Sequence, residues 1–216
     1  NLGGGGFMLV RMADGRTLLL DLREMAPGSA SRDMYLDEAG EPTRGSLEGW
    51  RASGVPGTVA GFERALQLYG TKPWAELIRP AIELAGQGYR VPYDLAESLK
   101  RSSEKLGKFP ESHRIFLRSG EFYEKGDLFR QPELAATLSR IATRGAKEFY
   151  EGDTARRLAE EMTANGGTIT LDDLRAYKPV ERQPLEGAYR GYSILTAPPP
   201  SSGGVGLLQM LGILEG

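Results

Sequence analysis

Arg23 is the residue whose type and surroundings most clearly suggest chemistry in this sequence. It lies between Asp21 and Glu24, directly after the apolar run at residues 18–20. Three charges within four residues at the end of a buried strand require partners. The planar guanidinium either forms a structural bridge with Asp21 or Glu24, or it binds a carboxylate or phosphate from elsewhere. The residues alone leave both interpretations open.

Three other places could also contribute chemistry. Ser201 and Ser202 precede two glycines and an apolar segment, and such a loop before a helix is a ready anion site. A tight strand-to-helix turn has the same composition, and no phosphate-loop lysine follows. We interpret the serines as residues that cap and tighten a turn. Thr58 is interpreted as a helix N-cap and His113 as a loop residue, because neither has a partner at a telling spacing.

The segment that must position Arg23 is predicted to be a β-hairpin. Apolar runs at residues 7–10 and 18–20 flank Asp14 and Gly15, a pair favoured in two-residue turns because both positions need positive φ. We expect this hairpin to be buried on both faces. The four glycines at residues 3–6 offer no side-chain contacts, so they indicate either close backbone approach by another segment or ligand, or a flexible loop.

The rest of the chain reads as scaffold. Apolar residues at helical spacing predict a helix from Thr58 to Gly70, then helices over residues 74–87, 92–106 and 132–144 and one that Asp153 caps. Strand character over residues 185–197, on both sides of a turn at Arg190 and Gly191, is expected to join the sheet of the hairpin, and a helix over residues 205–214 follows. Because strands and helices do not alternate regularly, the order favours an α+β fold.

Composition restricts the classes of function. The chain has 27 basic and 29 acidic residues without a like-charge block, which disfavours a nucleic-acid partner or a polybasic membrane patch. No apolar run reaches membrane-spanning length. The absence of cysteine excludes disulfides, thiol nucleophiles and cysteine metal sites, and a single histidine excludes a multi-histidine metal site. We expect the initiator and any signal peptide to precede Asn1.

Several longer motifs, taken together and in order, resemble the large subunit of γ-glutamyltranspeptidases, also called glutathione hydrolases. The resemblance covers essentially all 216 residues. The motifs are GGGGFM at 3–8, DLREMAP at 21–27, SRDMYL at 31–36, ASGVPGTVAG at 52–61, ANGGTIT at 164–170, YRGY at 189–192 and PPPSSGG at 198–204.

The resemblance implies a fold and a reaction. It implies that residues 1–216 are a single incomplete domain of an N-terminal-nucleophile hydrolase, a four-layer αββα sandwich whose precursor cleaves itself into two subunits. In that family a threonine at the start of the small subunit attacks the γ-glutamyl carbonyl of glutathione, with its own α-amino group as base. Water or an amino acid or peptide amine then accepts the γ-glutamyl group. We therefore expect no catalytic residue in this span and no activity from it alone. No cofactor or metal is implied, and the location is expected to be periplasmic or secreted.

The resemblance also gives Arg23 a role. Within D-x-R-E-M-A-P it matches the family's arginine that binds the substrate α-carboxylate, and Asp21 and Glu24 would then orient its guanidinium. Leu22 replaces a residue that is often aromatic, so we expect an altered pocket wall. Three alternatives remain: a cephalosporin or glutaryl acylase, a relative that processes poly-γ-glutamate, and a non-catalytic ligand-binding domain. The small-subunit residues that face Arg23, and the presence of the threonine, would discriminate among them.

Overall fold

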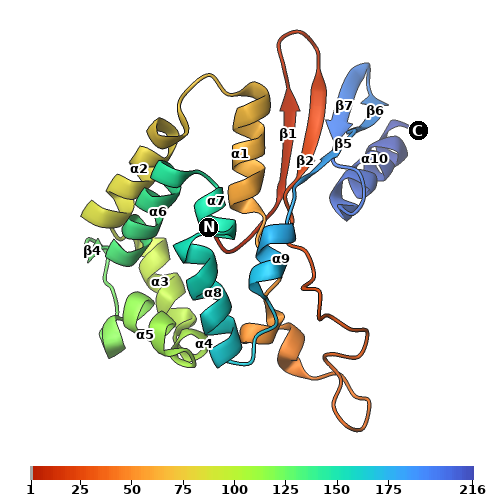
Figure 1. Ribbon diagram of the computed structural model, residues 1–216. Helices are drawn as coiled ribbons and strands as arrows, with labels where there is room; N and C mark the ends of the chain where they lie inside the picture. Colours follow the sequence, from red (N-terminus) through yellow and green to blue (C-terminus); the bar gives the residue numbers. More distant parts are fainter. Residues whose placement is uncertain (1) are drawn as a thin grey trace. The chain divides into compact units, whose positions relative to one another are not determined.

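Strands β1 (Phe7–Arg11) and β2 (Thr17–Asp21) form the predicted antiparallel hairpin in the computed structural model, which describes residues 2–216 (Figure 1). The expected two-residue turn is wrong. The Met12 amide donates to the Arg16 carbonyl at 2.9 Å, and of the predicted pair Asp14 and Gly15 only Gly15 has positive φ, 89°. Asp14 instead accepts a hydrogen bond from the Arg16 amide at 3.0 Å. This side-chain bond stabilises a longer loop in which Asp14 avoids the left-handed region.

Burial on both faces holds for β2 but not for β1. Strand β2 is central in a three-stranded sheet of order β1-β2-β5, with β5 at Val180–Arg182. All its residues from 18 to 21 are buried, whereas β1 lies at the edge and leaves 42% of Leu9 exposed. The central position of β2 follows from its continuous apolar run, which requires cover on each side.

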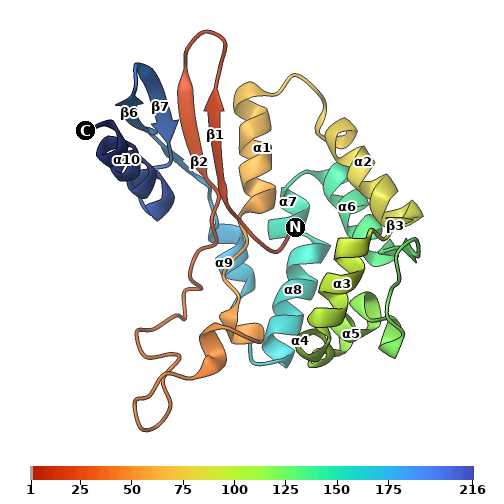
Figure 2. The ribbon, with the colours of Figure 1, turned by 180° about the vertical axis from the view of Figure 1, so that it is seen from behind.

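Helix α1 (Thr58–Tyr69) covers one face of β2, as Figures 1 and 2 show. Leu18, Leu20 and Leu22 form a buried cluster against this helix, because alternate residues of a strand point to the same face. A Cβ at Gly61 would lie 2.4 Å from the Leu22 Cβ, so the glycine permits direct contact between helix and strand. The helix ends at Gly70 as predicted, but Gly57 is the N-cap, and Thr58 is the first helical residue.

The glycines before β1 allow close approach of backbone segments. The Gly4 carbonyl accepts hydrogen bonds from the amides of Gly57 at 2.9 Å and Thr58 at 3.0 Å, at the start of α1. A Cβ at Gly5 would lie only 2.3 Å from the Leu22 carbonyl oxygen. Of the two interpretations of this segment, the structure supports close approach by another segment.

The strand predicted over residues 185–197 does not join the sheet of the hairpin. It forms a separate two-stranded sheet of β6 (Leu185–Tyr189) and β7 (Tyr192–Thr196). Arg190 and Gly191, with φ of 48° and 82°, make the tight turn between them. Helix α10 (Ser202–Glu215) begins three residues earlier than predicted and packs on β6, where Gly187 leaves room for Leu208.

Three helices precede β5 in the same part of the chain. They are α7 (Lys147–Tyr150), α8 (Asp153–Ala164) and α9 (Leu171–Ala176). Thr170 and Asp173 form a complete capping box at the start of α9, and Asp173 also accepts the Gly28 amide at 2.6 Å. Partial burial opposes ionisation of Asp173, but the hydrogen bonds from Thr170 and Gly28 outweigh it and lower the pKa of the carboxyl. The predicted N-cap Asp153 is instead the first helical residue, after Gly152.

Residues 72–145 form a compact unit of their own, separate from the unit of residues 2–71 and 146–216. Helices α2 and α6 pack against each other, and Phe129 of the short β3–β4 ribbon is buried in a cluster with Val91 and Ala96. The helix predicted over 92–106 is broken at Ser102, and His113 lies in a helix rather than a loop. The elements of this unit are α2 (Trp74–Gln87), β3 (Tyr89–Arg90), α3 (Tyr93–Arg101), α4 (Ser103–Gly107), α5 (Pro110–Phe116), β4 (Leu128–Phe129) and α6 (Pro132–Arg144), with 3₁₀ turn η3 at Arg118–Gly120.

The chain therefore mixes helices and antiparallel strands, in agreement with the α+β prediction. Two further 3₁₀ turns, η1 (Arg44–Ser46) and η2 (Trp50–Ala52), lie in the long segment between β2 and α1. The division into two units describes how closely residues pack within this chain. It does not test whether residues 1–216 are a single incomplete domain, which stays a prediction.

Gly5 and Gly6 provide a matched pair of substitutions. Gly5→Ala places a Cβ against the Leu22 carbonyl, whereas nothing lies within 4 Å of a Cβ at Gly6. We expect Gly5→Ala to destabilise the protein by about 1–3 kcal/mol through overpacking, and Gly6→Ala to stay within about 0.5 kcal/mol. Urea unfolding of the two variants checks this, and equal midpoints would contradict the close approach.

Candidate functional site

The backbone at Arg23 is fixed by side chains from other parts of the chain. The last sheet-like contact is a pair of hydrogen bonds between Leu22 and Gly6. Beyond it, the Arg23 amide donates to Asp21 Oδ1 at 3.1 Å, and the Arg23 carbonyl accepts from the Tyr177 hydroxyl at 2.9 Å. Two residues later, Met25 and Val55 form an isolated β-bridge. The Arg23 backbone is thus held on both sides.

Asp21 does not pair with the Arg23 side chain. Its Oδ2 accepts a hydrogen bond of 2.8 Å from Arg182 Nε, and the Asp21 side chain is only 8% exposed. Arg182 lies opposite Leu19 on β5, one diagonal step from Asp21 on the same face of the sheet. Of the two interpretations of Arg23, the structural bridge to Asp21 is therefore not formed. Asp21 contacts the Arg23 amide and not the guanidinium, so the expected orientation of the guanidinium by Asp21 is not seen. Asp21 pairs with Arg182 rather than Arg23 because the pairing of β2 and β5 places the Asp21 and Arg182 side chains next to each other.

The Arg23 guanidinium is exposed. Within residues 2–216 no carboxylate forms an ion pair with it, and its Cζ lies 6.0 Å from the centre of the Phe7 ring. Glu24 lines the same pocket as Arg23 but forms no ion pair with it among the described residues. The result is a rigid backbone that carries a guanidinium available to an external anion.

A pocket of about 390 Å³ lies at this place. Its charged lining residues are Asp21, Arg23, Glu24, Lys178 and Arg182, with Tyr177 and Pro200 also on the wall. Because Asp21 already pairs with Arg182, the balance of the remaining charges is positive. This arrangement suits a ligand that carries a carboxylate.

Leu22 does not form the wall of this pocket. It is 4% exposed and belongs to the leucine cluster that faces α1. Successive side chains of an extended segment alternate in direction, so Asp21 and Arg23 face the pocket while Leu22 faces the core. The expected effect of Leu22 on the pocket wall is therefore wrong for this chain.

Two stacked tyrosines support the site. The rings of Tyr150 and Tyr177 lie 5.7 Å apart with an angle of 10° between their planes. The Tyr150 hydroxyl donates to the Pro56 carbonyl at 2.9 Å and accepts from the Ala60 amide at 3.2 Å. Burial, with the charges of Asp21 and Glu24, raises the pKa of Tyr177 to about 12, and burial also raises the pKa of Tyr150. Both phenols are therefore protonated donors at neutral pH.

The serine-glycine loop has a structural explanation. Ser201 occupies the N-cap position of α10, but its side chain makes no capping hydrogen bond, so the expected capping role is wrong. The turn is closed instead by the Ser201 amide, which donates to the Pro198 carbonyl at 3.1 Å. A Cβ at Gly204 would meet the Ala197 carbonyl, so this glycine lets the helix approach the end of β7.

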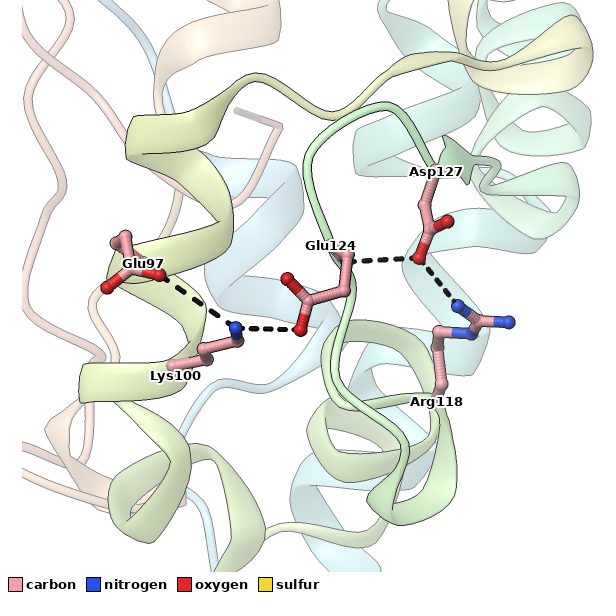
Figure 3. Close-up of polar contacts among 5 residues, drawn as sticks. All are labelled: Glu97, Lys100, Arg118, Glu124 and Asp127. Carbon is pink, nitrogen blue, oxygen red and sulfur yellow. Dashed lines mark hydrogen bonds and ion pairs between the residues drawn. The ribbon is translucent and has the colours of Figure 1, made fainter.

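A second group of charged residues lies in the unit of residues 72–145 (Figure 3). Lys100 contacts Glu124 at 2.8 Å and Glu97 at 3.8 Å, and its hydrogen bond to Glu124 raises the pKa of the ammonium. Asp127 accepts from Arg118 at 2.8 Å and from the Glu124 amide at 3.0 Å. These charges satisfy one another and tie the segment before β4 to α3 and η3. The cluster is a structural network on the surface of this unit.

The described residues contain neither a metal cluster nor a membrane-spanning helix. No set of three or more His, Asp or Glu side chains within residues 2–216 is arranged to hold a metal ion. Likewise, none of the helices described is both long and apolar enough to cross a membrane.

Sequence reasoning identified Arg23 but missed Arg182 and Tyr177. These residues lie 161 and 154 positions from their partners Asp21 and Arg23. Strand β5 is only three residues long and carries two charges, so no periodicity marked it as a neighbour of β2. Tyr177 was visible only as the end of a short helix.

Comparisons with known proteins agree on one family. The family model described as Gamma-glutamyltranspeptidase matches residues 1–216. A glutathione hydrolase proenzyme of Escherichia coli strain K12 is 51% identical over 217 residues, and an acylase ACY 1 proenzyme of Pseudomonas sp. strain V22 is 40% identical over 220 residues. The matches cover 100% and 99% of this chain, but only 37% and 39% of those proteins.

The solved structures give the same result. The crystal structure of Helicobacter pylori gamma-glutamyltranspeptidase superposes with a TM-score of 0.97 at 46% identity. It covers 100% of this chain, which corresponds to 62% of that chain. The fold described above is therefore shared, and the chain spans well under half the length of the curated relatives it matches.

Substitution of Ser201 and Ser202 tests whether their hydroxyls contribute to stability or to catalysis. Because Ser201 makes no capping bond, we expect Ser201→Ala and Ser202→Ala to change the free energy of unfolding by at most about 0.5 kcal/mol, less than the ~1 kcal/mol typical of a lost N-cap. Turnover by the complete protein should fall by at most about one decade, since neither serine has a base at hand. Complete loss of turnover in a folded variant would show that a serine takes part in the reaction.

Proposed function

Because this chain belongs to the gamma-glutamyltranspeptidase family, we propose that it is the large-subunit part of an enzyme that transfers the γ-glutamyl group of glutathione and related compounds. The acceptor is water or the amine of an amino acid or peptide. The chain supplies scaffold and the arginine that binds the substrate carboxylate. The single observation that carries this proposal is the rigidly held Arg23, whose guanidinium is without an ion pair among residues 2–216 and lines a pocket.

The reaction requires groups outside these residues. A threonine at the start of the small subunit would attack the γ-carbonyl carbon through its hydroxyl oxygen, while its α-amino group takes the hydroxyl proton. The carbon–nitrogen bond then breaks, and the leaving amine receives that proton. Water or an acceptor amine attacks the resulting ester and restores the threonine.

The role of Arg23 in this reaction is to fix the other end of the acyl group. A guanidinium fork matches a carboxylate with two parallel hydrogen bonds. Its backbone is already ordered by Asp21 and Tyr177, so binding does not have to order the segment. An acyl group held at its α-carboxylate presents its γ-carbonyl at a fixed distance, which is the positioning that catalysis needs.

The same proposal extends to the architecture and the cellular location. We expect the mixed fold of this chain to be completed by the small subunit into a four-layer αββα sandwich, as a heterodimer produced by self-cleavage of a precursor. The proenzyme names of the relatives support this expectation. We also propose a periplasmic or secreted location, as the family resemblance implies.

The acylase relatives support an alternative substrate. A glutaryl group equals a γ-glutamyl group without its α-amino group, so both carry the carboxylate that Arg23 would bind. The 40% identity to an acylase proenzyme is therefore compatible with the same arginine. Comparison of γ-glutamyl and glutaryl anilides in the complete protein separates the two functions, because only the α-amino group differs.

Substitution of Arg23 tests the proposed contact. Arg23→Lys keeps the charge but loses the fork, and because charged hydrogen bonds contribute about 1.5–3 kcal/mol, kcat/KM for a γ-glutamyl anilide should fall roughly 10- to 150-fold. Arg23→Leu should lose more, since it leaves a carboxylate desolvated without a partner. The measurement is steady-state kinetics of the self-cleaved enzyme.

A second substrate serves as the control for Arg23. A 4-aminobutanoyl anilide lacks the α-carboxylate but keeps the amine, so the contact is absent from the parent enzyme as well. The effect of Arg23→Leu on this substrate should be much smaller. If Arg23→Leu self-cleaves normally and still discriminates between the two anilides as the parent does, Arg23 does not bind the carboxylate.

The chain alone should be inactive. Residues 1–216 contain no N-terminal threonine and no small-subunit oxyanion donors, and such positioning supplies most of the catalysis. The purified chain is expected to release no anilide above the buffer rate. Measurable turnover by this span would contradict the assignment of the nucleophile to another segment.

A further inference from the structure

The backbone carbonyl of Arg23 accepts its hydrogen bond from a single side chain, that of Tyr177. Strand β2 ends at Asp21, and the ladder to Gly6 ends at Leu22, so no strand supplies a donor to Arg23. The Tyr177 hydroxyl takes that place at 2.9 Å. The other polar group of the Arg23 backbone, its amide, is held by Asp21.

Tyr177 is itself held in a position that permits little adjustment. It is 7% exposed, and its ring stacks on Tyr150. On another side it lies against Gly57, where a Cβ would clash with both the phenol oxygen and the Leu22 carbonyl oxygen. The Tyr177 amide also donates to the Leu174 carbonyl at 3.2 Å, at the end of α9. The hydroxyl is therefore a fixed donor, and among residues 2–216 no other group donates a hydrogen bond to the Arg23 carbonyl.

We propose that Tyr177 is a positioning residue that sets the Arg23 guanidinium for the substrate carboxylate. The inference rests on the proposed function of Arg23. Tyr177 lines the same pocket and points its hydroxyl at the Arg23 backbone, so it acts through Arg23. Two parallel hydrogen bonds to a carboxylate tolerate little displacement, and a shift of the Arg23 backbone moves the whole fork.

Tyr177→Phe tests this inference, because it removes the hydroxyl and keeps the stacked ring. We expect KM for a γ-glutamyl anilide to rise roughly 3- to 10-fold with little change in kcat, which corresponds to the loss of one neutral hydrogen bond. KM for the 4-aminobutanoyl anilide, which has no α-carboxylate, should stay the same. A structural defect alone would affect both substrates equally, and that result would overturn the proposal.

Tyr150→Phe is the matched control. It removes a buried hydroxyl from the same ring stack, but this hydroxyl bonds to Pro56 and Ala60 rather than to Arg23. We expect this variant to lose stability without a change in the discrimination between the two anilides. An equal change in KM for both tyrosine variants would assign the effect to the stack and would overturn the role of the Tyr177 hydroxyl.

Amide hydrogen exchange of the complete protein separates this inference from the proposed function. Exchange over residues 22–25 should become faster in Tyr177→Phe than in the parent or in Tyr150→Phe. This readout needs no turnover, so it decides whether Tyr177 holds Arg23 even if the enzyme acts on another substrate. Unchanged exchange in Tyr177→Phe would overturn the inference whatever the substrate. Faster exchange together with loss of the Arg23 effect on the two anilides would overturn the proposed function, and it would leave Tyr177 only as the residue that holds the Arg23 backbone.

Discussion

The buried carboxylate of Asp21 is the constraint on which the arrangement around Arg23 depends. One oxygen accepts the Arg23 amide and the other accepts Arg182 Nε, so a single charge connects strand β2, strand β5 and the end of the hairpin. The Asp21 side chain is 8% exposed and that of Arg182 is 34% exposed, so removal of Arg182 would leave a buried carboxylate without its ion pair, which destabilises a fold. The geometry of the candidate site is therefore coupled to the stability of the sheet.

Close packing around Leu22 adds a second constraint. Three glycines from two segments contact this one residue. Cβ atoms at Gly5, before β1, and at Gly57, the N-cap of α1, would lie 2.3 and 2.2 Å from its carbonyl oxygen, and one at Gly61 in α1 would lie 2.4 Å from its Cβ. Side chains at these positions would separate the segments. Since Arg23 follows directly, the packing that fixes Leu22 also limits where the Arg23 backbone can lie.

Local sequence patterns predicted those features that depend on neighbouring residues. The hairpin and the end of α1 at Gly70 follow from apolar runs and cap chemistry. Arg23 was found because charges at the end of a buried strand are unusual. The partners around Arg23 could not be found in this way. Asp21 pairs with Arg182 rather than Arg23 because strand β5, far along the chain, places Arg182 beside it. Local reasoning thus identifies the charged group but not which neighbour neutralises it.

The Arg23 guanidinium can bind an external anion because neither acidic neighbour, Asp21 or Glu24, forms an ion pair with it among the described residues. Asp21 binds Arg182 instead, and Glu24 has no ion pair to Arg23 within residues 2–216, so the guanidinium is left exposed at the pocket. An exposed guanidinium is hydrated, and its contact with a carboxylate gains strength when surrounding chain excludes water and lowers the local dielectric. That cover would come from segments beyond these residues. The geometry of carboxylate binding is accordingly a property of this chain, while the strength of the contact depends on what encloses the pocket.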